Sequence, residues 1–459
     1  MDRFKGKKIA IVGLSTEGQD AIRFFLKQRC DIICLDRRDE TILFSSYPDM
    51  KNLPVRFHLG DSYLSELSAV DIIVRTPGMS LKTPELIQAR ARGVEITSVT
   101  KLFLELCKAP IIGVTGTKGK GTTSTLIYEM LKKSGKTAYL GGNVGTPLLS
   151  LVESIKPEDW VVLELSSFQL EDLNQSPHIA VVLKVTQEHL ANFDPLATNF
   201  HASREAYVEA KKHIISHQKT GDFAVFHADD PTSCSFAKYT EATPFFYGKS
   251  PNAQALIEND AVFLMNDEGK HGIVDRSHMK LLGSHNLENV AAASLASSLV
   301  GITLDDIKST AEAFPGLPLR LEKVGVKNGV LYINDSFSTT PESTISAIDA
   351  FDAPIILILG GSEKGADFTL MGEAIAHSNV KKTIVVGQMT ERIVQSLHTG
   401  GFQGEMITGL TSMHDMVTKA AQGSQPGDVI LLSPACASFD LFKNYKERGK
   451  QFTYEVSLL

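Results

Sequence analysis

The segment TGTKGKGTTS, residues 115–124, has the residue types of a phosphate-binding loop. It follows an apolar stretch, residues 111–114, and precedes a helix-forming segment, so backbone amides and a helix N-terminus converge there. Lys120 adds positive charge for the β and γ phosphates of a nucleotide. Because Gly121 takes the adjacent position where a magnesium-binding hydroxyl is usual, Thr122 or Thr123 must supply that hydroxyl. A glycine-rich turn with two solvated lysines is the less favoured interpretation. The predicted nucleotide-binding residues are Gly116, Thr117, Lys118, Gly119, Lys120, Gly121, Thr122 and Thr123.

Two further side chains follow buried strands. Glu164 ends the apolar stretch 160–165, and His189 follows the stretch 179–185. Ligands of parallel sheets bind at the carboxyl ends of the strands, so both side chains are candidates for the metal of the nucleotide. The alternatives are that Glu164 caps the next helix and that His189 is structural. The segment containing Lys211 and Lys212 has the pattern of an amphipathic helix with a solvated lysine pair, and spacing alone selects neither lysine.

The N-terminal segment carries a second nucleotide fingerprint. Gly13 and Gly18 follow the first apolar stretch, with Ser15 in the middle glycine position, and Asp36-Arg37 ends the second stretch. An acidic residue at this spacing can bond a ribose. The side chain of Ser15 leaves less room than a glycine for a pyrophosphate to approach the backbone closely. The pattern therefore disfavours NAD and allows a uridine nucleotide that is bound in another pose.

In the last third of the chain, three predicted strands end in polar groups. These are Asn334-Asp335-Ser336, Lys364 after two glycines, and the segment 433–439 with Ser433, Ser438 and Phe439. Strand ends that share one edge of a sheet form a rim, so we expect a small anionic substrate to bind there.

Strand-like and helix-like segments alternate from end to end, which predicts an α/β fold with largely parallel, Rossmann-like sheets. Predicted strands lie at residues 9–12, 111–114, 160–165, 179–182, 355–359, 383–386 and 429–432, and an alanine-rich helix at 289–300. New segments begin near Ala109-Pro110 and after the proline-glycine stretch 314–318. We therefore expect three domains: 1–108 for a uridine nucleotide, 109–314 with the phosphate loop, and 315–459 for the amino acid.

The composition excludes several classes. The 459 residues are 43% hydrophobic and 22% charged, as in a globular protein, and the net charge of -7 argues against nucleic-acid and anionic-membrane binding. The five scattered cysteines predict neither a disulfide framework nor a zinc ribbon. No apolar run approaches the length of a transmembrane helix, and the start lacks a signal-peptide pattern. A cytoplasmic protein is expected.

Together, several motifs along the whole chain resemble the Mur ligase superfamily. They are the loop at Thr115, Gly142-Asn143-Val144-Gly145, Glu164-Leu165-Ser166-Ser167-Phe168-Gln169-Leu170, Gly283-Ser284-His285-Asn286 with Asn289, Gly316-Leu317-Pro318-Leu319-Arg320, Asn334-Asp335-Ser336 and residues 432–438. The resemblance implies an ATP-dependent amide ligase of peptidoglycan precursor synthesis, which adds D-glutamate to UDP-N-acetylmuramoyl-L-alanine through an acyl phosphate. It also implies magnesium and a monomer.

The resemblance further implies residue roles. Lys120, Glu164, His189 and Lys211 would be catalytic, with Lys211 carbamylated and holding a second magnesium ion. Asn286, Asn289, Arg320 and Asp335 would contact adenosine or its phosphates. Thr16, Glu17, Asp36, Arg37, Thr76, Gly78, Asn143 and His189 would bind the uridine substrate. Thr339, Lys364, Ser433 and Phe439 would receive D-glutamate.

The sequence departs from the family pattern at three places. Gly121 replaces a hydroxyl residue, as in folylpolyglutamate synthases; Phe337 replaces a lysine near the amino-acid pocket; and Gln187 and Ala191 flank His189. The loss of the lysine bears on which amino acid is accepted. Two alternatives therefore remain: a folylpolyglutamate synthase-type ligase, which would lack the N-terminal nucleotide domain, and an inactive regulator that binds a UDP-sugar.

Overall fold

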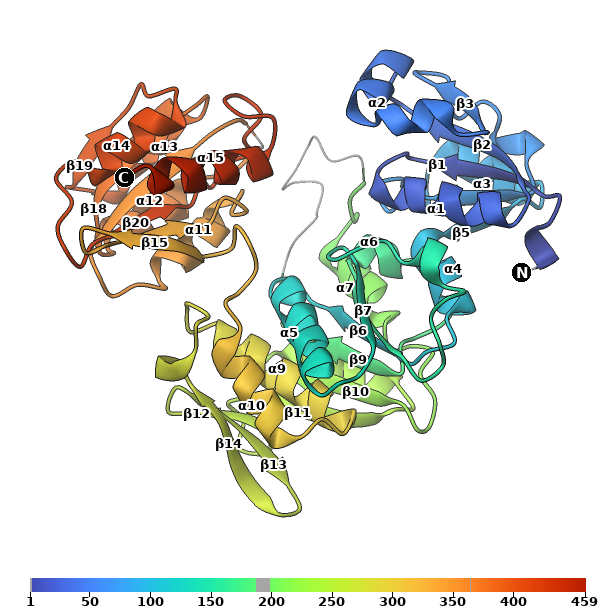
Figure 1. Ribbon diagram of the computed structural model, residues 1–459, viewed down its shortest axis with the longest axis horizontal. Helices are drawn as coiled ribbons and strands as arrows, with labels where there is room; N and C mark the ends of the chain where they lie inside the picture. The colour runs from blue at the N-terminus through green and yellow to red at the C-terminus, as the bar shows by residue number, and fades with distance from the viewer. Residues whose placement is uncertain (1, 187–198, 364) are drawn as a thin grey trace. The chain divides into compact units, whose positions relative to one another are not determined.

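The computed structural model describes residues 2–186, 199–363 and 365–459, and these form two compact units (Figure 1). The first unit is made of residues up to 186, residues 199–275 and Glu288–Ala311. The second is made of Arg276–Leu287 and Glu312–Leu459. Each unit is built on parallel β-sheet covered by helices.

The first sheet of the first unit has five parallel strands in the order β3-β2-β1-β4-β5. The strands are β1 (Lys8–Val12), β2 (Asp31–Asp36), β3 (Arg56–Leu59), β4 (Ile72–Arg75) and β5 (Glu95–Ser98), and the helices are α1 (Thr16–Lys27), α2 (Glu40–Ser46), α3 (Pro84–Ala91) and α4 (Val99–Leu106). After the exposed Lys8, every residue of the central strand β1 is buried. That continuous apolar run is typical of a parallel strand covered on both faces.

The second sheet of this unit has nine strands in the order β14-β13-β12-β11-β10-β9-β6-β8-β7. They are β6 (Ile111–Thr115), β7 (Ala138–Gly142), β8 (Trp160–Glu164), β9 (Ile179–Val182), β10 (Phe223–His227), β11 (Thr243–Gly248), β12 (Ala255–Glu258), β13 (Ala261–Asn266) and β14 (Gly269–Asp275). The helices are α5 (Lys120–Lys133), α6 (Ser167–Leu170), α7 (Arg204–Lys212), α8 (Pro231–Ser235), α9 (Asn286–Leu299) and α10 (Leu304–Ala313). Pairing is parallel from β7 to β12 and antiparallel from β12 to β14.

One hydrophobic core joins the two sheets of the first unit. It contains Ile9 and Ile11 of β1 together with Val161 and Leu163 of β8. Arg75, whose side chain is fully buried at the end of β4, reinforces the junction with an ion pair to Asp172 at 3.1 Å. The predicted ranges 1–108 and 109–314 hold one sheet each, but their sheets share this core. We keep the three-domain division as a proposal.

The second unit has a six-stranded sheet in the order β15-β16-β20-β17-β18-β19, parallel except for the β15–β16 pair. The strands are β15 (Glu322–Lys327), β16 (Val330–Asn334), β17 (Ile355–Gly360), β18 (Val380–Val386), β19 (Glu405–Ile407) and β20 (Val429–Leu432), and the helices are α11 (Pro341–Ile348), α12 (Thr369–Ala376), α13 (Thr390–Gly400), α14 (Met413–Ala421) and α15 (Tyr445–Ser457). Along β17, Leu357 and Leu359 enter the core that α12 and α13 cover, whereas Ile356 and Ile358 enter the core that α14 and α15 cover. Because successive side chains of a strand point to opposite faces of the sheet, β17 contributes to the hydrophobic cores on both faces.

These observations confirm the predicted α/β fold class. The seven predicted strands correspond to β1, β6, β8, β9, β17, β18 and β20, and the predicted alanine-rich helix is α9. The antiparallel extension β13–β14, a hairpin at the sheet edge in Figure 1, was not predicted. None of the helices in the described ranges is long and apolar enough to cross a membrane.

Candidate active site

The pairing of β6 brings the principal candidate residues to one edge of the nine-stranded sheet. β6 lies between β8 and β9, with Val114 opposite Glu164 and Thr115 opposite Val182. All three strands are parallel, so their carboxyl ends share that edge. The phosphate loop after β6 and the carboxylate of Glu164 therefore lie side by side, as the sequence predicted.

Two positions in the loop require glycine. Gly116 has φ +148°, and a Cβ atom there would lie 2.6 Å from the Cβ of Leu183. Gly119 has φ +84° as the N-cap of α5, and its Cβ would lie 2.2 Å from Oδ1 of Asn289. Side chains at either position would clash and would be strained. The backbone can therefore turn tightly into the N-terminus of a 14-residue helix, which suits an anion.

Two lysines donate to the same carbonyl of this loop. The Lys120 ammonium donates to the carbonyls of Gly116 at 3.1 Å and Thr117 at 2.8 Å. Lys211 in α7 donates to the Gly116 carbonyl at 2.8 Å and to the Thr115 hydroxyl at 3.5 Å. Lys211 is only 1% exposed. The expectation that it belongs to a solvated pair was wrong, because the helix turns Lys211 inward.

Tyr207 supports both the loop and Lys211, and the sequence did not single it out. Its hydroxyl is hydrogen-bonded to the Thr117 hydroxyl at 3.0 Å, and the Lys211 ammonium lies 4.6 Å from its ring centroid. Tyr207 and Lys211 are four residues apart in α7, so they share one face of the helix. The four-residue spacing and the aromatic residue in a largely polar helix were the signals in the sequence that could have identified Tyr207.

The two threonines after Lys120 differ in their surroundings. The Thr123 side chain is buried, and its hydroxyl donates to Oδ1 of Asn289 at 3.3 Å. Thr122 is half-buried. Lys118, which comes earlier in the loop, is exposed. Thr122 is thus the more exposed of the two residues.

Glu164 does not cap the helix that follows it. The N-terminus of α6 is capped by Ser166 and Gln169. The Ser166 side chain accepts from the Gln169 backbone amide, and the Gln169 side chain accepts from the Ser166 backbone amide. Glu164 is 4% exposed, and its carbonyl accepts from the Asn143 amide at 3.0 Å. The helix-capping alternative is therefore wrong, and the pairing of β7 with β8 places Asn143 beside Glu164.

The donor set at this edge fits a magnesium ion. Glu164 offers a carboxylate there, and Thr122 carries a hydroxyl in the first turn of α5, the helix that follows the loop. Magnesium in nucleotide sites takes few carboxylates, and phosphate oxygens and water complete its shell. Within the described residues, His, Cys, Asp and Glu form no group of three or more suited to a metal. Of the predicted site residues, His189 lies outside the described residues, and so does Lys364.

In the five-stranded sheet, the fingerprint loop after β1 meets the ends of β2 and β4. A Cβ on Gly13, which has φ +85°, would lie 2.4 Å from the Thr76 hydroxyl oxygen. The Asp36 carboxylate accepts from the Leu14 amide at 2.8 Å and forms an ion pair with Arg38 at 2.8 Å. Burial opposes ionisation of Asp36, but the bonds from Arg38 and Leu14 outweigh it, and the pKa of Asp36 lies below its ordinary value. Asp36 thus orders the loop, and Arg38 is a partner that the sequence reasoning missed.

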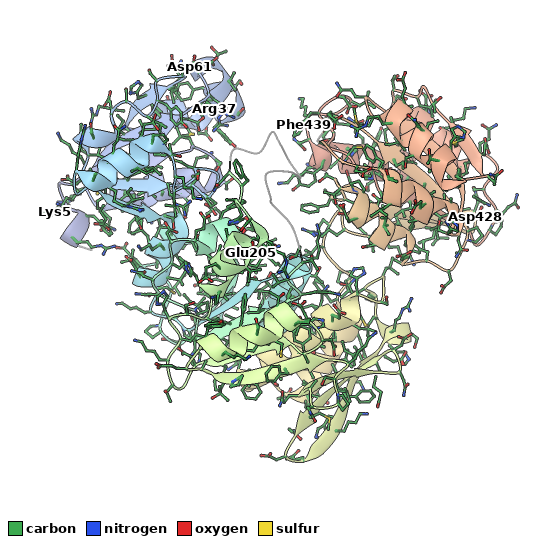
Figure 2. All side chains as sticks on the ribbon, turned by 180° about the vertical axis from the view of Figure 1, so that it is seen from behind. Lys5, Arg37, Asp61, Glu205, Asp428 and Phe439 are labelled. Carbon is green, nitrogen blue, oxygen red and sulfur yellow. The ribbon has the colours of Figure 1, made fainter. Side chains whose placement is uncertain are left out.

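The other predicted uridine-site residues lie near this loop or on the surface. Glu17 in α1 accepts from the Gln169 side chain at 2.9 Å, and burial is the main cause that raises the pKa of Glu17. Thr16 begins α1 and is exposed, as are Gly78 and Arg37. Figure 2 labels Arg37 among the side chains of this unit.

In the second unit, the three strands that were predicted to end in polar groups, β16, β17 and β20, lie side by side. Lys364, the polar residue predicted after β17, lies outside the described residues. β20 pairs with β16 on one side and with β17 on the other, all in parallel. The Ser433 hydroxyl, fully buried, bonds to the Asp335 carboxylate at 2.8 Å and to the Thr344 hydroxyl at 3.1 Å. Burial raises the pKa of Asp335 to about 6, although hydrogen bonds and the charge of Arg320 act in the opposite direction.

Three other predicted residues belong to this unit by their place in the chain. Asn286 begins α9, and its side-chain amide donates to the Leu282 carbonyl at 2.7 Å. Thr339 is half-buried before α11, and Phe439, labelled in Figure 2, is 74% exposed.

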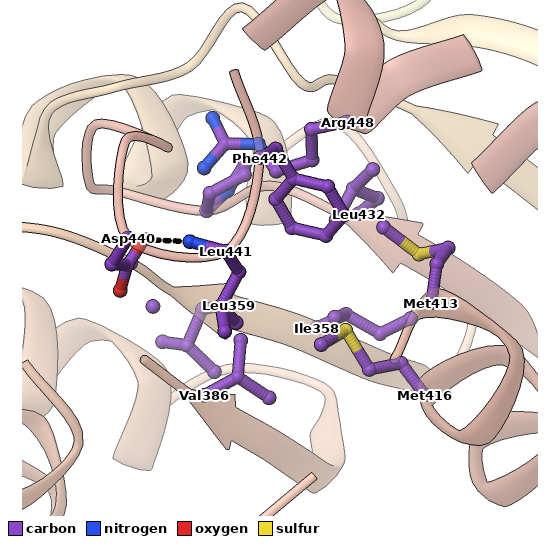
Figure 3. Close-up of a pocket in the computed structure, with 13 residues that line it drawn as sticks. Ile358, Leu359, Val386, Met413, Met416, Leu432, Asp440, Leu441, Phe442 and Arg448 are labelled. Atoms are coloured by element: carbon purple, nitrogen blue, oxygen red, sulfur yellow. Dashed lines mark hydrogen bonds between the residues drawn. The ribbon is translucent and has the colours of Figure 1, made fainter. Parts of the chain in front are cut away.

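An apolar recess at the carboxyl ends of β17 and β20 has other lining residues, among them Met413, Met416 and Phe442 (Figure 3). Arg448 borders this recess and donates to the Ser336 carbonyl at 2.9 Å. Thr339, Ser433 and Phe439 do not line it. The recess is therefore part of the packing beneath the rim.

Comparison with domain families gives three matches along the chain. A Mur ligase MurD-like N-terminal domain matches residues 7–98, a Mur ligase middle domain matches residues 114–297, and a Mur ligase glutamate ligase domain matches residues 319–436. The matched ranges contain the five-stranded sheet, the nine-stranded sheet except for the first residues of β6, and the six-stranded sheet, respectively.

Curated relatives match over nearly the full length. The UDP-N-acetylmuramoylalanine--D-glutamate ligase of Symbiobacterium thermophilum is 38% identical, covering 99% of this chain and 98% of that protein. The enzyme of the same name from Acetivibrio thermocellus is 37% identical, covering 98% and 96%. Among solved structures, the UDP-N-acetylmuramate-alanine ligase MurC of Thermotoga maritima has a TM-score of 0.63 at 17% identity, covering 98% and 99%. MurF ligase from the same organism, in complex with ADP, has a TM-score of 0.58 at 19% identity, covering 100% and 97%.

The raised pKa of Asp335 predicts a pH-dependent stability. Asp335 holds its proton to about pH 6 in the folded protein, whereas its ordinary value is 3.8. The raised pKa changes the free energy of unfolding by on the order of 2 to 3 kcal/mol. This contribution to the stability of the folded protein is fully present below about pH 4 and is lost as the pH rises through 6. Asp335→Asn should therefore gain stability relative to the wild type between pH 4 and pH 7. Hydrogen exchange of β16 and β20 amides, compared between the two proteins at each pH, measures the difference. A difference that stays constant over this range would contradict the buried, protonated carboxyl.

Proposed function

The chain belongs to the Mur ligase family, and we propose that it joins D-glutamate to the L-alanyl carboxylate of UDP-N-acetylmuramoyl-L-alanine, forming ADP and phosphate. The proposal places the protein in peptidoglycan precursor synthesis, as a cytoplasmic monomer without nucleic-acid or membrane partners. It is supported by the name and full-length similarity of the curated relatives and by the domain match at the N-terminus, which a folylpolyglutamate synthase would lack.

The observation that carries the proposal is the convergence on the loop after β6. Lys211 is 95 residues away from Gly116 in sequence, yet its ammonium contacts the Gly116 carbonyl. Glu164 reaches the same edge through the register of β8 with β6. A glycine-rich loop, two lysines and a buried carboxylate at one strand edge favour chemistry on a nucleotide phosphate.

The residues of the chain would bind and orient the reactants in the following way. The loop amides and Lys120 bind the phosphates of ATP and orient the γ phosphorus toward the substrate carboxylate. An oxygen of that carboxylate forms a bond to phosphorus, the bond to the β,γ-bridging oxygen breaks, and ADP leaves with the electron pair. The ammonium of D-glutamate loses a proton to solvent, and the resulting amine attacks the carbonyl carbon of the acyl phosphate. The tetrahedral intermediate loses a second proton to solvent, and phosphate leaves with the electron pair of the carbon–oxygen bond as the amide forms. Positive charge near the developing oxyanion lowers the barrier.

Magnesium ions would be held by Thr122, Glu164, His189 and Lys211, and when bound they would neutralise charge on the phosphate oxygens. Asn286, Asn289, Arg320 and Asp335 would contact adenosine or its phosphates. The uridine substrate would be bound by Thr16, Glu17, Asp36, Arg37, Thr76, Gly78, Asn143 and His189. Asp36 would act by holding the loop after β1 in place. Thr339, Lys364, Ser433 and Phe439 would receive D-glutamate.

Phosphate release with UDP-N-acetylmuramoyl-L-alanine, ATP, magnesium and a panel of D- and L-amino acids tests the function. We expect D-glutamate to give the highest kcat/KM and ADP to form in equal amount. Release with folate substrates and none with the UDP substrate would instead identify a folylpolyglutamate synthase-type ligase. Tight UDP-substrate binding with no ADP in a single turnover would identify an inactive regulator.

We propose that Thr122, and not Thr123, supplies the magnesium-binding hydroxyl, because the Thr123 hydroxyl is buried against Asn289. Thr122→Val should raise the magnesium concentration for half-maximal activity by about tenfold, the loss of one ligand contact worth roughly 1.4 kcal/mol. Thr123→Val is the matched control, and it should mainly lower the melting temperature, since it removes a buried hydrogen bond. A larger shift in magnesium dependence for Thr123→Val would reverse the assignment.

We also propose that Lys211 is carbamylated in the active enzyme. The Lys211 side chain is buried against the phosphate loop, and a carbamate there would present oxygen atoms, which magnesium prefers to an amine. Lys211→Ala should lose most of the activity, and added short-chain carboxylic acids should restore part of it by occupying the vacated space. Lys212→Ala in the same helix serves as the control and should stay active, because the Lys212 ammonium pairs with Glu209 and lies 4.2 Å from the centroid of the Tyr239 ring. Failure of every acid to restore activity would count against the carbamate.

A further inference from the structure

Arg75 is a charged residue to which the proposed reaction gives no role, and its side chain is fully buried. It is the last residue of β4 and directly precedes residues 76–79, the loop that carries two of the residues proposed for the uridine site. Burial of a cation is costly unless carboxylates and hydrogen bonds replace the lost water. A buried ion pair is often no more stabilising than apolar side chains of the same volume. The bonds of Arg75 thus indicate a geometric role in addition to a stabilising one.

The guanidinium of Arg75 joins two segments that belong to different sheets of the first unit. One terminal nitrogen, Nη1, donates to the Met79 carbonyl at 3.1 Å, which closes the loop of residues 76–79. The other, Nη2, donates to the Phe168 carbonyl in α6 at 3.3 Å and lies 3.1 Å from the Asp172 carboxylate, to which Nε donates at 3.3 Å. Because the guanidinium is planar and its donors have a fixed arrangement, it sets the direction of the two segments as well as their distance.

The segment on the far side of this bridge follows Glu164 closely. β8 ends at Glu164, and α6 begins shortly after it. A second bond reaches the same loop, because the side-chain amide of Asn199 donates to the Pro77 carbonyl at 2.8 Å. Asn199 shortly precedes α7, the helix that carries Lys211. The loop of residues 76–79 is thus attached to both of the segments that bring Glu164 and Lys211 to the phosphate loop.

The proposed substrate has to fit two places at once. Its uridine would be held at the five-stranded sheet, whereas its alanyl carboxylate has to reach the γ phosphate at the loop after β6. A reacting group that is about 1 Å out of place can react about 100-fold more slowly. The distance between the uridine-binding loop and the phosphate loop therefore bears directly on the rate of phosphoryl transfer.

We propose that Arg75 is a positioning residue that holds the uridine-binding loop, residues 76–79, in a fixed place relative to Glu164 and the phosphate loop. A substrate that is bound by its uridine is then presented with its carboxylate at the γ phosphate. This inference rests on the proposed function, from which it takes the UDP substrate. It adds a residue that acts through the backbone of two loops.

The test compares the dissociation constant of UDP, measured by calorimetry, with the single-turnover rate of ADP formation at saturating UDP-N-acetylmuramoyl-L-alanine, ATP and magnesium. Asp172→Asn removes the charge across the bridge with little change in volume, and it leaves the bond from Arg75 to Met79 in place. UDP should bind this variant within about twofold of the wild type, whereas ADP formation should slow about 10- to 100-fold, because the substrate is held but misplaced.

Ser150→Ala is the matched control, because it weakens the same junction through residues that have no proposed ligand. The Ser150 hydroxyl donates to the buried carboxylate of Asp20 in α1, so it joins the short helix η4 (Leu149–Leu151) to the helices of the five-stranded sheet. This variant should have a lower melting temperature but should form ADP at the wild-type rate. An equal slowing in Ser150→Ala would show that Arg75 has only a structural role and would overturn the proposal.

A double-mutant cycle assigns the effect to the ion pair. Asp172→Asn should slow ADP formation no further in an Arg75→Met background, and losses that multiply would overturn the proposal. An unchanged rate in Asp172→Asn would also overturn it, as would a UDP affinity that falls as much as the rate, since Arg75 would then serve uridine binding. A wild-type protein that neither binds UDP nor forms ADP would refute the proposed function and this inference together. Normal turnover of the wild type with an unaltered variant would refute the inference alone.

Discussion

The parallel pairing of β6 with β8 on one side and β9 on the other is the constraint on which the candidate site depends. The three strands are almost entirely buried, and the phosphate loop and Glu164 both stand at their carboxyl ends. There the chain must turn sharply, and Gly116 permits the turn because no other residue fits against Leu183. The loop, Glu164 and Lys211 are then brought together from distant parts of the sequence, and of these only the loop needs a special local conformation.

The electrostatics of the loop follow from that turn. When the backbone amides point outward toward an anion, carbonyl groups point inward, and the Gly116 carbonyl accepts from both Lys120 and Lys211. Lys120 thereby places positive charge beside the loop in a protein whose net charge is -7. An acidic protein can bind a polyanion in this way, because local charge and oriented amides outweigh the weak repulsion of distant, screened carboxylates.

Sequence patterns predicted the class of the fold and much of the site, for reasons that are local. Continuous apolar runs mark buried parallel strands, and polar residues after them mark the strand ends, so the loop, Glu164 and the rim near Asp335 could be placed. What could not be predicted depends on side-chain direction. The spacing around Lys211 is compatible with an exposed or a buried face, and only the tertiary packing of α7 against the loop at Gly116 decides between them. Likewise, a pattern of ribose recognition at Asp36 cannot reveal that Arg38 and Leu14 already occupy its carboxylate.

The central claim is that the substrate carboxylate is activated by phosphoryl transfer before the amine attacks. Transfer of isotope tests it most directly: UDP-N-acetylmuramoyl-L-alanine carrying ¹⁸O in both oxygens of the alanyl carboxylate is turned over with ATP and D-glutamate, and the released phosphate is analysed by mass spectrometry. An acyl phosphate requires one ¹⁸O atom in each phosphate released and the other in the amide. Phosphate that contains no ¹⁸O, formed alongside the amide product, would contradict the account.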